Sequence, residues 1–127
     1  MQFLHILGLV SDDLRQSVQR AREALDLVDP DQAAEAIGHL RSAGEHLSAA
    51  LNEALSEAAL EGRSVRQLAN DAGMAPNSIP PRLGASSALA PYAEGGRVTR
   101  EGLARARYDR RTPLRFTPRR STHQEDA

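Results

Sequence analysis

Residues 64–83 carry the sequence SVRQLANDAGMAPNSIPPRL, which predicts two short helices separated by a tight turn. Ser64 is placed to cap the first helix, and Gly73 supplies the positive φ that the turn needs. Ala69 is small enough for the two helices to cross closely. The apolar positions that close a miniature core around the crossing are Leu68, Ala72, Met74 and Ile79. The spacing therefore predicts a compact helical corner.

Two prolines in the second of these helices leave its start open. Pro80 and Pro81 stand where the helix should be in mid-course, and an interior proline removes a hydrogen bond and clashes with the preceding turn. Either the helix starts late, so that both prolines lie in its first turn, or it is distorted and serves protein contacts. We expect the late start, because Asn77 and Ser78 are both good helix caps.

The segment resembles the helix-turn-helix of bacterial repressors and regulators over less than a fifth of the chain. The resemblance implies a second helix that enters the major groove of DNA and a first helix that braces on the DNA backbone. Carried over by position, the base-reading candidates are Ala75, Pro76, Asn77, Ser78, Pro81 and Arg82. The backbone-contacting candidates are Ser64, Arg66 and Gln67. The alternative is a purely structural corner that makes no DNA contact.

The candidate side chains differ in what they can recognise. Asn77 can bond adenine in two places, while Arg82 can pair with guanine or reach a phosphate. A late helix start shifts the reading surface, so we rank Arg82 and the arginines after it above Asn77.

The fold class is predicted to be all-α. Aromatic residues make up 3% of the sequence and tryptophan is absent, so the core must be built from Leu, Ala, Val and Ile, which suits packed helices. Asp29-Pro30-Asp31 predicts the end of one helix and the start of another. The first helix starts either at a Ser11 cap or earlier, near Gln2. Its apolar stripe is Leu7, Leu14, Val18, Ala21, Leu25 and Val28.

These two helices should form a long antiparallel hairpin. The stripe predicted for the second helix is Ala33, Ile37, Leu40, Gly44, Leu47, Leu51, Ala54 and Ala58. A seam rich in Ala and Gly buries little area, so a second copy of the hairpin is expected to cover the remaining apolar surface. The hairpin therefore predicts a homodimer.

Charge divides the chain into an acidic front and a basic back. Residues 1–62 hold four arginines and eleven acidic residues, whereas residues 63–120 hold twelve arginines and four acidic residues. A polyanion is the partner that this division favours for the basic half; the alternative is that the two halves neutralise each other. All sixteen basic residues are arginine, which is typical of GC-rich codon usage and weakens any single arginine as a phosphate ligand.

The C-terminal segment supports nucleic-acid binding separately from the motif. Glu94-Gly95-Gly96 predicts a linker, and Thr99 can cap a short helix that ends near Tyr108. Residues 110–120 combine charge with two prolines and should be disordered without a partner. The arginines of this basic arm are Arg97, Arg100, Arg105, Arg107, Arg110, Arg111, Arg115, Arg119 and Arg120. Together with the stacking candidates Tyr108 and Phe116, the arm leaves RNA or single strands open as ligands.

Several classes of protein are disfavoured. Cysteine is absent, which excludes disulfides and thiolate chemistry, and no nucleophile elbow, phosphate loop or paired carboxylates indicate an enzyme or a cofactor. His39 and His46 lie near Glu35 and Glu45, but a solvated helix face fits them better than a metal site. The apolar run at residues 3–10 is too short to span a bilayer, so we expect a cytoplasmic protein.

The sequence therefore predicts three segments: a hairpin at 1–61, a helix-turn-helix unit at 62–93, and a linker, short helix and basic tail at 94–127. The leading hypothesis is a small dimeric regulator that binds double-stranded DNA. The alternatives are an adaptor of the phage-packaging or plasmid-partition type, whose hairpin recruits a protein partner, and an antitoxin-like inhibitor whose tail folds on an enzyme.

Overall fold

The computed structural model describes residues 2–112, with side chains described from residue 12 onward. Its elements are α1 (Gln2–Asp26), α2 (Ala33–Leu60), α3 (Val65–Ala72), the 3-10 turn η1 (Pro76–Ser78), α4 (Ile79–Gly84), the 3-10 turn η2 (Ala90–Tyr92) and α5 (Arg100–Arg111). Within residues 2–112 the only β-type pairing is an isolated bridge between Glu94 and Arg97. The all-α prediction is confirmed. The predictions for Arg115, Arg119, Arg120 and Phe116 lie outside the described residues.

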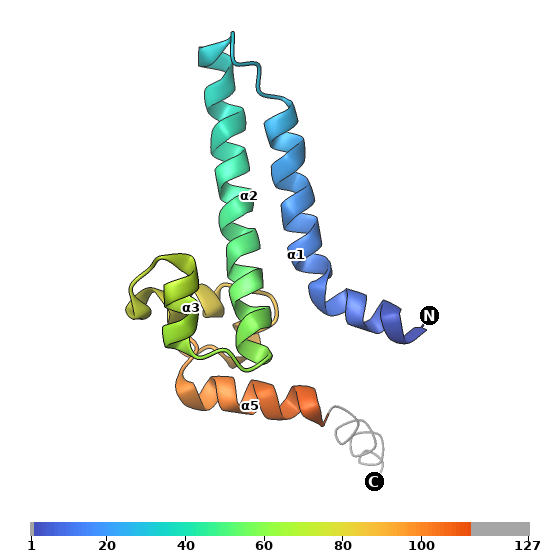
Figure 1. Ribbon diagram of the computed structural model, residues 1–127, viewed down its shortest axis with the longest axis vertical. Helices are drawn as coiled ribbons and strands as arrows, with labels where there is room; N and C mark the ends of the chain where they lie inside the picture. The colour runs from blue at the N-terminus through green and yellow to red at the C-terminus, as the bar shows by residue number, and fades with distance from the viewer. Residues whose placement is uncertain (1, 113–127) are drawn as a thin grey trace.

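The two long helices and the short ones occupy different ends of the molecule. α1 and α2 lie side by side and run in opposite directions, with their connecting turn at one end (Figure 1). α3 and α4 surround the last turns of α2 at the other end, where α5 lies across the base (Figure 1). Of the two long helices, only α2 therefore contributes residues to the core of the short helices.

Alanines form the contact between α1 and α2. Small side chains allow two helix axes to approach closely, because the distance between the axes depends on the side chains at the contact. The buried residues of this contact are Ala21 and Ala24 on α1 and, at intervals of seven, Ala36, Ala43 and Ala50 on α2.

The prediction of the α2 seam is therefore wrong: the buried stripe lies one residue earlier in the sequence than the predicted one. Ile37, Leu40 and Leu47 are 67%, 50% and 52% exposed instead of buried against α1. Periodicity favours the stripe with the larger side chains, but the close approach of the helices selects the neighbouring stripe of alanines. A row of aliphatic side chains is left on the surface.

The turn between the long helices is longer than predicted. The Asp31 backbone N–H donates to Asp29 Oδ1 at 3.0 Å, and the Gln32 N–H donates to the Asp29 carbonyl at 2.9 Å. Asp29 thus caps a turn, and α2 begins at Ala33 instead of at Pro30. α1 begins at Gln2, so the earlier of its two expected starts is observed and position 11 lies inside the helix.

Local structure in residues 64–83 follows the predicted pattern. The Gln67 N–H donates to Ser64 Oγ at 3.1 Å and the Ser64 N–H donates to Gln67 Oε1 at 2.9 Å, which closes the N-terminus of α3. Gly73 ends α3 with a φ of 67°. α4 begins at Ile79, so the two prolines that follow lie in its first turn and the late start is confirmed, although the Ser78 side chain makes no capping bond.

The segment expected as a linker is a tight turn that belongs to the same core. The Glu94 N–H donates to the Arg97 carbonyl at 2.8 Å, and Gly95 and Gly96 adopt φ values of 61° and 79°. Thr99 caps α5 as predicted, and α5 continues to Arg111 instead of ending near Tyr108. The core shared by these elements is Leu55, Ala59, Leu68, Ala69, Ile79, Leu83, Leu89, Val98, Leu103 and Ala106.

Candidate nucleic-acid interface

The base-reading candidates form the exposed approach to α4. Ala75, Pro76, Asn77 and Ser78 are all exposed, as is Pro81 in the first turn of the helix. The side chains of Asn77 and Ser78 have no hydrogen-bond partner among the described residues. This leading turn is therefore open to an external hydrogen-bonding partner.

The backbone-contacting candidates on α3 divide into two kinds. Ser64 and Gln67 are joined to each other by the reciprocal capping bonds, which occupy the Ser64 hydroxyl oxygen and the Gln67 carbonyl oxygen. Arg66 lies between them, is exposed, and has no side-chain partner in the described part of the chain. Arg66 is the member of this group whose charge is uncommitted.

Arg82 is directed at α2. It donates from Nη1 to Asn52 Oδ1 at 2.8 Å and lies 3.4 Å from Ser48 Oγ. The side chain is half-buried. Arg82 therefore ties α4 to α2, and its guanidinium is already engaged within the chain.

Two arginines of the predicted basic arm also hold the fold together. Arg107 donates from Nε to the Ala59 carbonyl at 2.9 Å and from Nη2 to the Arg63 carbonyl at 3.0 Å. These carbonyls belong to the end of α2 and the loop after it, which a cation stabilises. Arg110 forms an ion pair with Glu57 at 3.3 Å. Both arginines thus attach α5 to α2.

Glu57 is ionised at some cost in this contact. Its side chain is 19% exposed, and desolvation by burial raises the pKa of its carboxyl above the ordinary value, although the charge of Arg110 and its hydrogen bond act in the opposite direction. The ion pair with Arg110 therefore offsets only part of the desolvation of the carboxylate.

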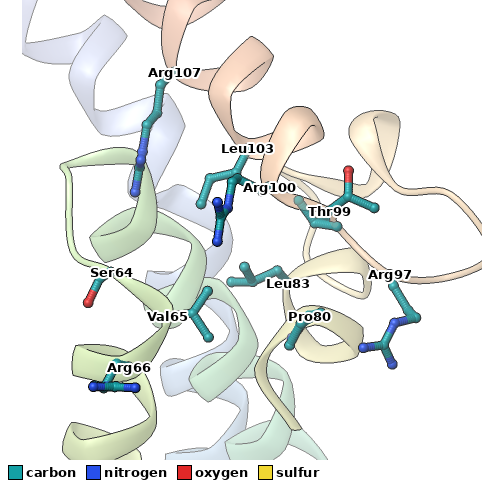
Figure 2. Close-up of a pocket in the computed structure, with 11 residues that line it drawn as sticks. Ser64, Val65, Arg66, Pro80, Leu83, Arg97, Thr99, Arg100, Leu103 and Arg107 are labelled. Carbon is teal, nitrogen blue, oxygen red and sulfur yellow. The ribbon is translucent and has the colours of Figure 1, made fainter. Parts of the chain in front are cut away.

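A cavity of about 660 Å³ opens between α3, α4 and α5. Its apolar floor is formed by Val65, Pro80, Leu83, Val98 and Leu103, and its polar and charged lining by Ser64, Thr99, Arg66, Arg97, Arg100 and Arg107. Figure 2 shows Arg66 and Arg97 on opposite sides of this group, with Arg100 between them. Four arginines from three segments of the chain, α3, the 94–97 turn and α5, thus line one hollow.

The positive charge of this cavity is not neutralised locally. Arg66, Arg97 and Arg100 are exposed, and their side chains make no hydrogen bond or ion pair with another described residue. Among the described residues that line the cavity, none is an aspartate or a glutamate. The cavity therefore presents several guanidinium groups to an external anion.

Backbone packing fixes the position of Arg97 beside the cavity. The Val98 N–H donates to the Pro80 carbonyl at 3.1 Å, which joins the 94–97 turn to α4. A Cβ atom built on Gly84 would lie 2.5 Å from the Gly96 carbonyl oxygen, so only glycine at this position allows the turn to pack so closely. The turn that the sequence presents as a linker is in fact the element that carries Arg97.

Two further arginines of the described part of the arm do not line the cavity. Arg105 and Arg111 are exposed on α5 and do not line it. Arg97 and Arg100 appear in the sequence only as members of a basic run, and they were not placed with the motif. The clue to their position is Gly95-Gly96, since paired glycines permit a tight turn that returns the chain to α4.

The row of aliphatic side chains on α2 is a second exposed surface. We define the leucine row as Ile37, Leu40, Gly44 and Leu47, which recur at spacings of three and four. A Cβ atom built on Gly44 would meet nothing within 4 Å. The row therefore presents three large exposed side chains, with open space at Gly44.

Neither a metal site nor a membrane span is found in the described part of the chain. No group of three His, Asp or Glu side chains in residues 12–112 is arranged to hold a metal ion. Across the described helices, none combines the length and apolar character needed to cross a bilayer. His39 and His46 are half-buried along the row of α2 alanines.

Comparison of the chain with models of known protein families, with curated proteins and with solved structures finds no match.

Proposed function

We propose that this chain is a helix-turn-helix DNA-binding protein that acts as a small homodimeric transcriptional regulator. The observation that carries the proposal is an exposed leading turn of α4 together with three uncommitted arginines, Arg66, Arg97 and Arg100, in a cavity that α4 also lines. A polar helix start reaches base edges in the major groove, while arginines on either side of it hold the phosphates.

The division of the arginines supports a DNA-facing surface on one side of the corner. The arginines that serve the fold, Arg82, Arg107 and Arg110, bond to α2 or the loop after it. Three of the arginines whose side chains have no described partner, Arg66, Arg97 and Arg100, gather instead at the starts of α3 and α5 and at the 94–97 turn. Uncommitted charge on one face is the arrangement that binding to a polyanion requires.

The dimer in this proposal forms through the leucine row of α2. α1 covers the alanine face of α2, and the short helices cover its last turns, so Ile37, Leu40 and Leu47 keep half or more of their surface exposed. A second copy supplies an identical row, as a two-fold symmetric interface requires. Two DNA-binding units joined in this way read a pseudo-palindromic site.

The direct test is gel-shift titration of the purified protein on genomic fragments at two salt concentrations. We expect a sequence preference, weaker binding at higher salt, and a further loss of affinity in Arg66→Ala. Asn77→Ala should change the preferred sequence more than it changes nonspecific affinity. The matched control is Arg22→Ala, which removes an exposed arginine from α1. Binding without any sequence preference, unchanged in Arg66→Ala, would overturn the proposal.

An adaptor is the second candidate, favoured by the exposure of the leucine row. In that case the row binds another protein, and the basic surface supplies only nonspecific attraction to DNA. Deleting the hairpin cannot separate the two functions, because Leu55 and Ala59 of α2 belong to the core of the short helices. The point variant Leu47→Glu separates them: a regulator loses affinity for a site with two half-sites, whereas an adaptor retains its DNA affinity and loses its protein partner.

A further inference from the structure

The cavity between α3, α4 and α5 combines an apolar floor with a rim of positive charge. Its volume of about 660 Å³ exceeds what packing voids in a protein interior provide and falls within the range of ligand sites. The floor is supplied by five apolar side chains from four segments. A ligand that fills it must present an anionic group to the rim and a less polar part to the floor.

The geometry of the guanidinium group favours an anion that offers several oxygen atoms. Each guanidinium offers a planar fork of N–H donors, which matches the oxygens of a phosphate or a carboxylate. Arg66, Arg97 and Arg100 stand on α3, the 94–97 turn and α5, at different sides of the cavity. A tetrahedral phosphate accepts hydrogen bonds from several directions at once, whereas a planar carboxylate accepts them mainly in one plane.

Arg107 contributes a fixed charge to the wall of the cavity. Its bonds to the Ala59 and Arg63 carbonyls hold the guanidinium in place before any ligand arrives. A preorganised charge loses little side-chain entropy when an anion binds. The caps of α3 and α5, Ser64 and Thr99, also lie at the cavity, so the positive ends of both helix dipoles add to the same potential.

The place of the cavity relative to α4 identifies the source of the phosphate. Pro80 lines the cavity, and the exposed leading turn of α4 ends at Ser78, two residues earlier. A duplex that lays its major groove on this turn brings its backbone close to α4, which lines the cavity through Pro80 and Leu83. The deoxyribose beside each phosphate supplies the less polar part that suits the floor.

We propose that this cavity binds a backbone phosphate of DNA, with Arg66, Arg97 and Arg100 as its direct ligands and Arg107 as a fixed charge in the wall. The proposal rests on the proposed DNA-binding function and names the contact that sets the register of α4 on the duplex. Phosphate contacts of this kind position a protein on DNA and carry no sequence information themselves.

The first arm of the test measures the salt dependence of binding to a duplex of about 30 base pairs, roughly three helical turns. Arg97→Ala and Arg100→Ala should each reduce the slope of log K against log salt by about 1 and weaken binding equally on preferred and random sequences. Arg100→Lys should retain most of the slope, because it keeps the charge. Arg22→Ala is the control, since Arg22 lies on α1 away from the cavity.

The second arm uses inorganic phosphate and sulfate and needs no DNA. Either anion should shift the NMR signals of the Arg66, Arg97 and Arg100 side chains in the full chain, and Arg100→Ala should raise the anion concentration needed at least severalfold. Thermal unfolding of each variant shows that the fold is retained before binding is compared.

The two arms distinguish failure of the inference from failure of the proposed function. DNA binding with sequence preference, whose slope is unchanged in Arg97→Ala and Arg100→Ala, overturns the phosphate site and leaves the function standing. Anion-dependent shifts at the three arginines without any DNA binding overturn the function and support a site for free phosphate. If the protein shows no DNA binding and the anions shift no arginine signal, both the function and the phosphate site are overturned.

Discussion

Arg82 Nη1 donates to Asn52 Oδ1 across 2.8 Å, which joins the short helix α4 to the long helix α2. The bond changes the role expected of Arg82, because a guanidinium held against α2 is not free to pair with a base. The arginines left available to the proposed DNA ligand are Arg66, Arg97 and Arg100. In the structure the Arg82 side chain therefore serves a contact within the fold.

Arg82→Ala should therefore affect stability more than DNA affinity. Loss of the hydrogen bond to Asn52 should lower the free energy of unfolding by about 1 kcal/mol, a value at the low end for a charged donor because the side chain is partly exposed. Urea denaturation measures this loss, and gel shift compares the affinity with that of Arg100→Ala. A larger loss of affinity in Arg82→Ala than in Arg100→Ala, with unchanged stability, would restore Arg82 as a DNA contact.

Sequence reasoning succeeded where the signals are local. The cap at Ser64, the positive φ at Gly73 and the late start at Ile79 all depend on residues within one or two turns of each other. Their hydrogen bonds form between near neighbours in the chain, so the residue types alone predict them.

Sequence reasoning failed where the partner is distant. Arg107 bonds the Ala59 carbonyl and Arg82 bonds Asn52, and no local pattern distinguishes these arginines from the unpaired Arg97 and Arg100. The α2 seam failed for a related reason, since two stripes one residue apart are both apolar. The distance between the packed helices depends on the side chains that both helices place at the contact, and the close approach selects the alanines.

Gly84→Ala should displace the turn that carries Arg97. The new Cβ would lie 2.5 Å from the Gly96 oxygen and 2.9 Å from the Gly96 carbonyl carbon, and these backbone atoms cannot rotate away. We expect a loss of about 1–3 kcal/mol in the free energy of unfolding, together with weaker DNA binding. Chemical denaturation and gel shift measure the two effects.

Gly38→Ala is the matched control for this glycine. A Cβ atom on Gly38 would meet nothing within 4 Å, and the residue lies inside α2. The substitution should raise the free energy of unfolding by about 0.5–1 kcal/mol, because alanine loses less backbone entropy in a helix. Equal effects of the two substitutions would show that the 94–97 turn does not pack on Gly84.

Ser86→Ala should break a fully buried hydrogen-bond chain. Ser56 Oγ donates to Ser86 Oγ at 2.6 Å, Ser86 Oγ donates to the Leu83 carbonyl at 2.8 Å, and the Leu89 N–H donates to Ser86 Oγ at 3.2 Å. Both serines are 0% exposed. The variant leaves the Ser56 hydroxyl without its acceptor, at a cost of about 1–3 kcal/mol.

A double-mutant cycle checks this account of the serine pair. Ser56→Ala combined with Ser86→Ala removes both hydroxyls, so the double variant should lose less stability than the sum of the two single variants. Denaturant unfolding of the four proteins provides the cycle. Strict additivity would mean that the two hydroxyls do not depend on each other.

Glu57→Gln should change the pH dependence of stability. Burial raises the pKa of the Glu57 carboxyl in the folded chain, so the folded state binds this proton more tightly than the unfolded state does. The resulting stabilisation is fully present below the ordinary value of 4.5 and is lost as pH rises through the raised pKa. The stability of Glu57→Gln relative to the natural protein should therefore increase from acidic to neutral pH.

The measurement is urea unfolding of both proteins at a pH below 4.5 and at neutral pH. Glu94→Gln serves as the control, because Glu94 is an exposed carboxylate whose side chain has no partner among the described residues. A relative stability of Glu57→Gln that falls with rising pH would mean that the ion pair with Arg110 outweighs desolvation.

Leu47→Glu should dissociate the proposed dimer without unfolding the chain. Ile37, Leu40 and Leu47 are each at least half exposed, so complete burial recovers about 1–1.5 kcal/mol for each side chain. Six such side chains from two copies supply about 6–9 kcal/mol, which is close to the cost of association. The free dimer should therefore be weak and dependent on concentration, and a DNA duplex with two half-sites should strengthen it.

Sedimentation equilibrium across a concentration series measures the association directly. The natural protein should rise from the 13.7 kDa chain mass toward twice that value, and Leu47→Glu should remain at the chain mass with unchanged helical circular dichroism. Leu27→Glu is the matched control, because Leu27 is 64% exposed but lies in the turn after α1, off the leucine row. A natural protein that stays monomeric both at high concentration and on a two-half-site duplex would rule out the dimer, and dissociation by Leu27→Glu alone would place its interface at the turn instead of along the leucine row.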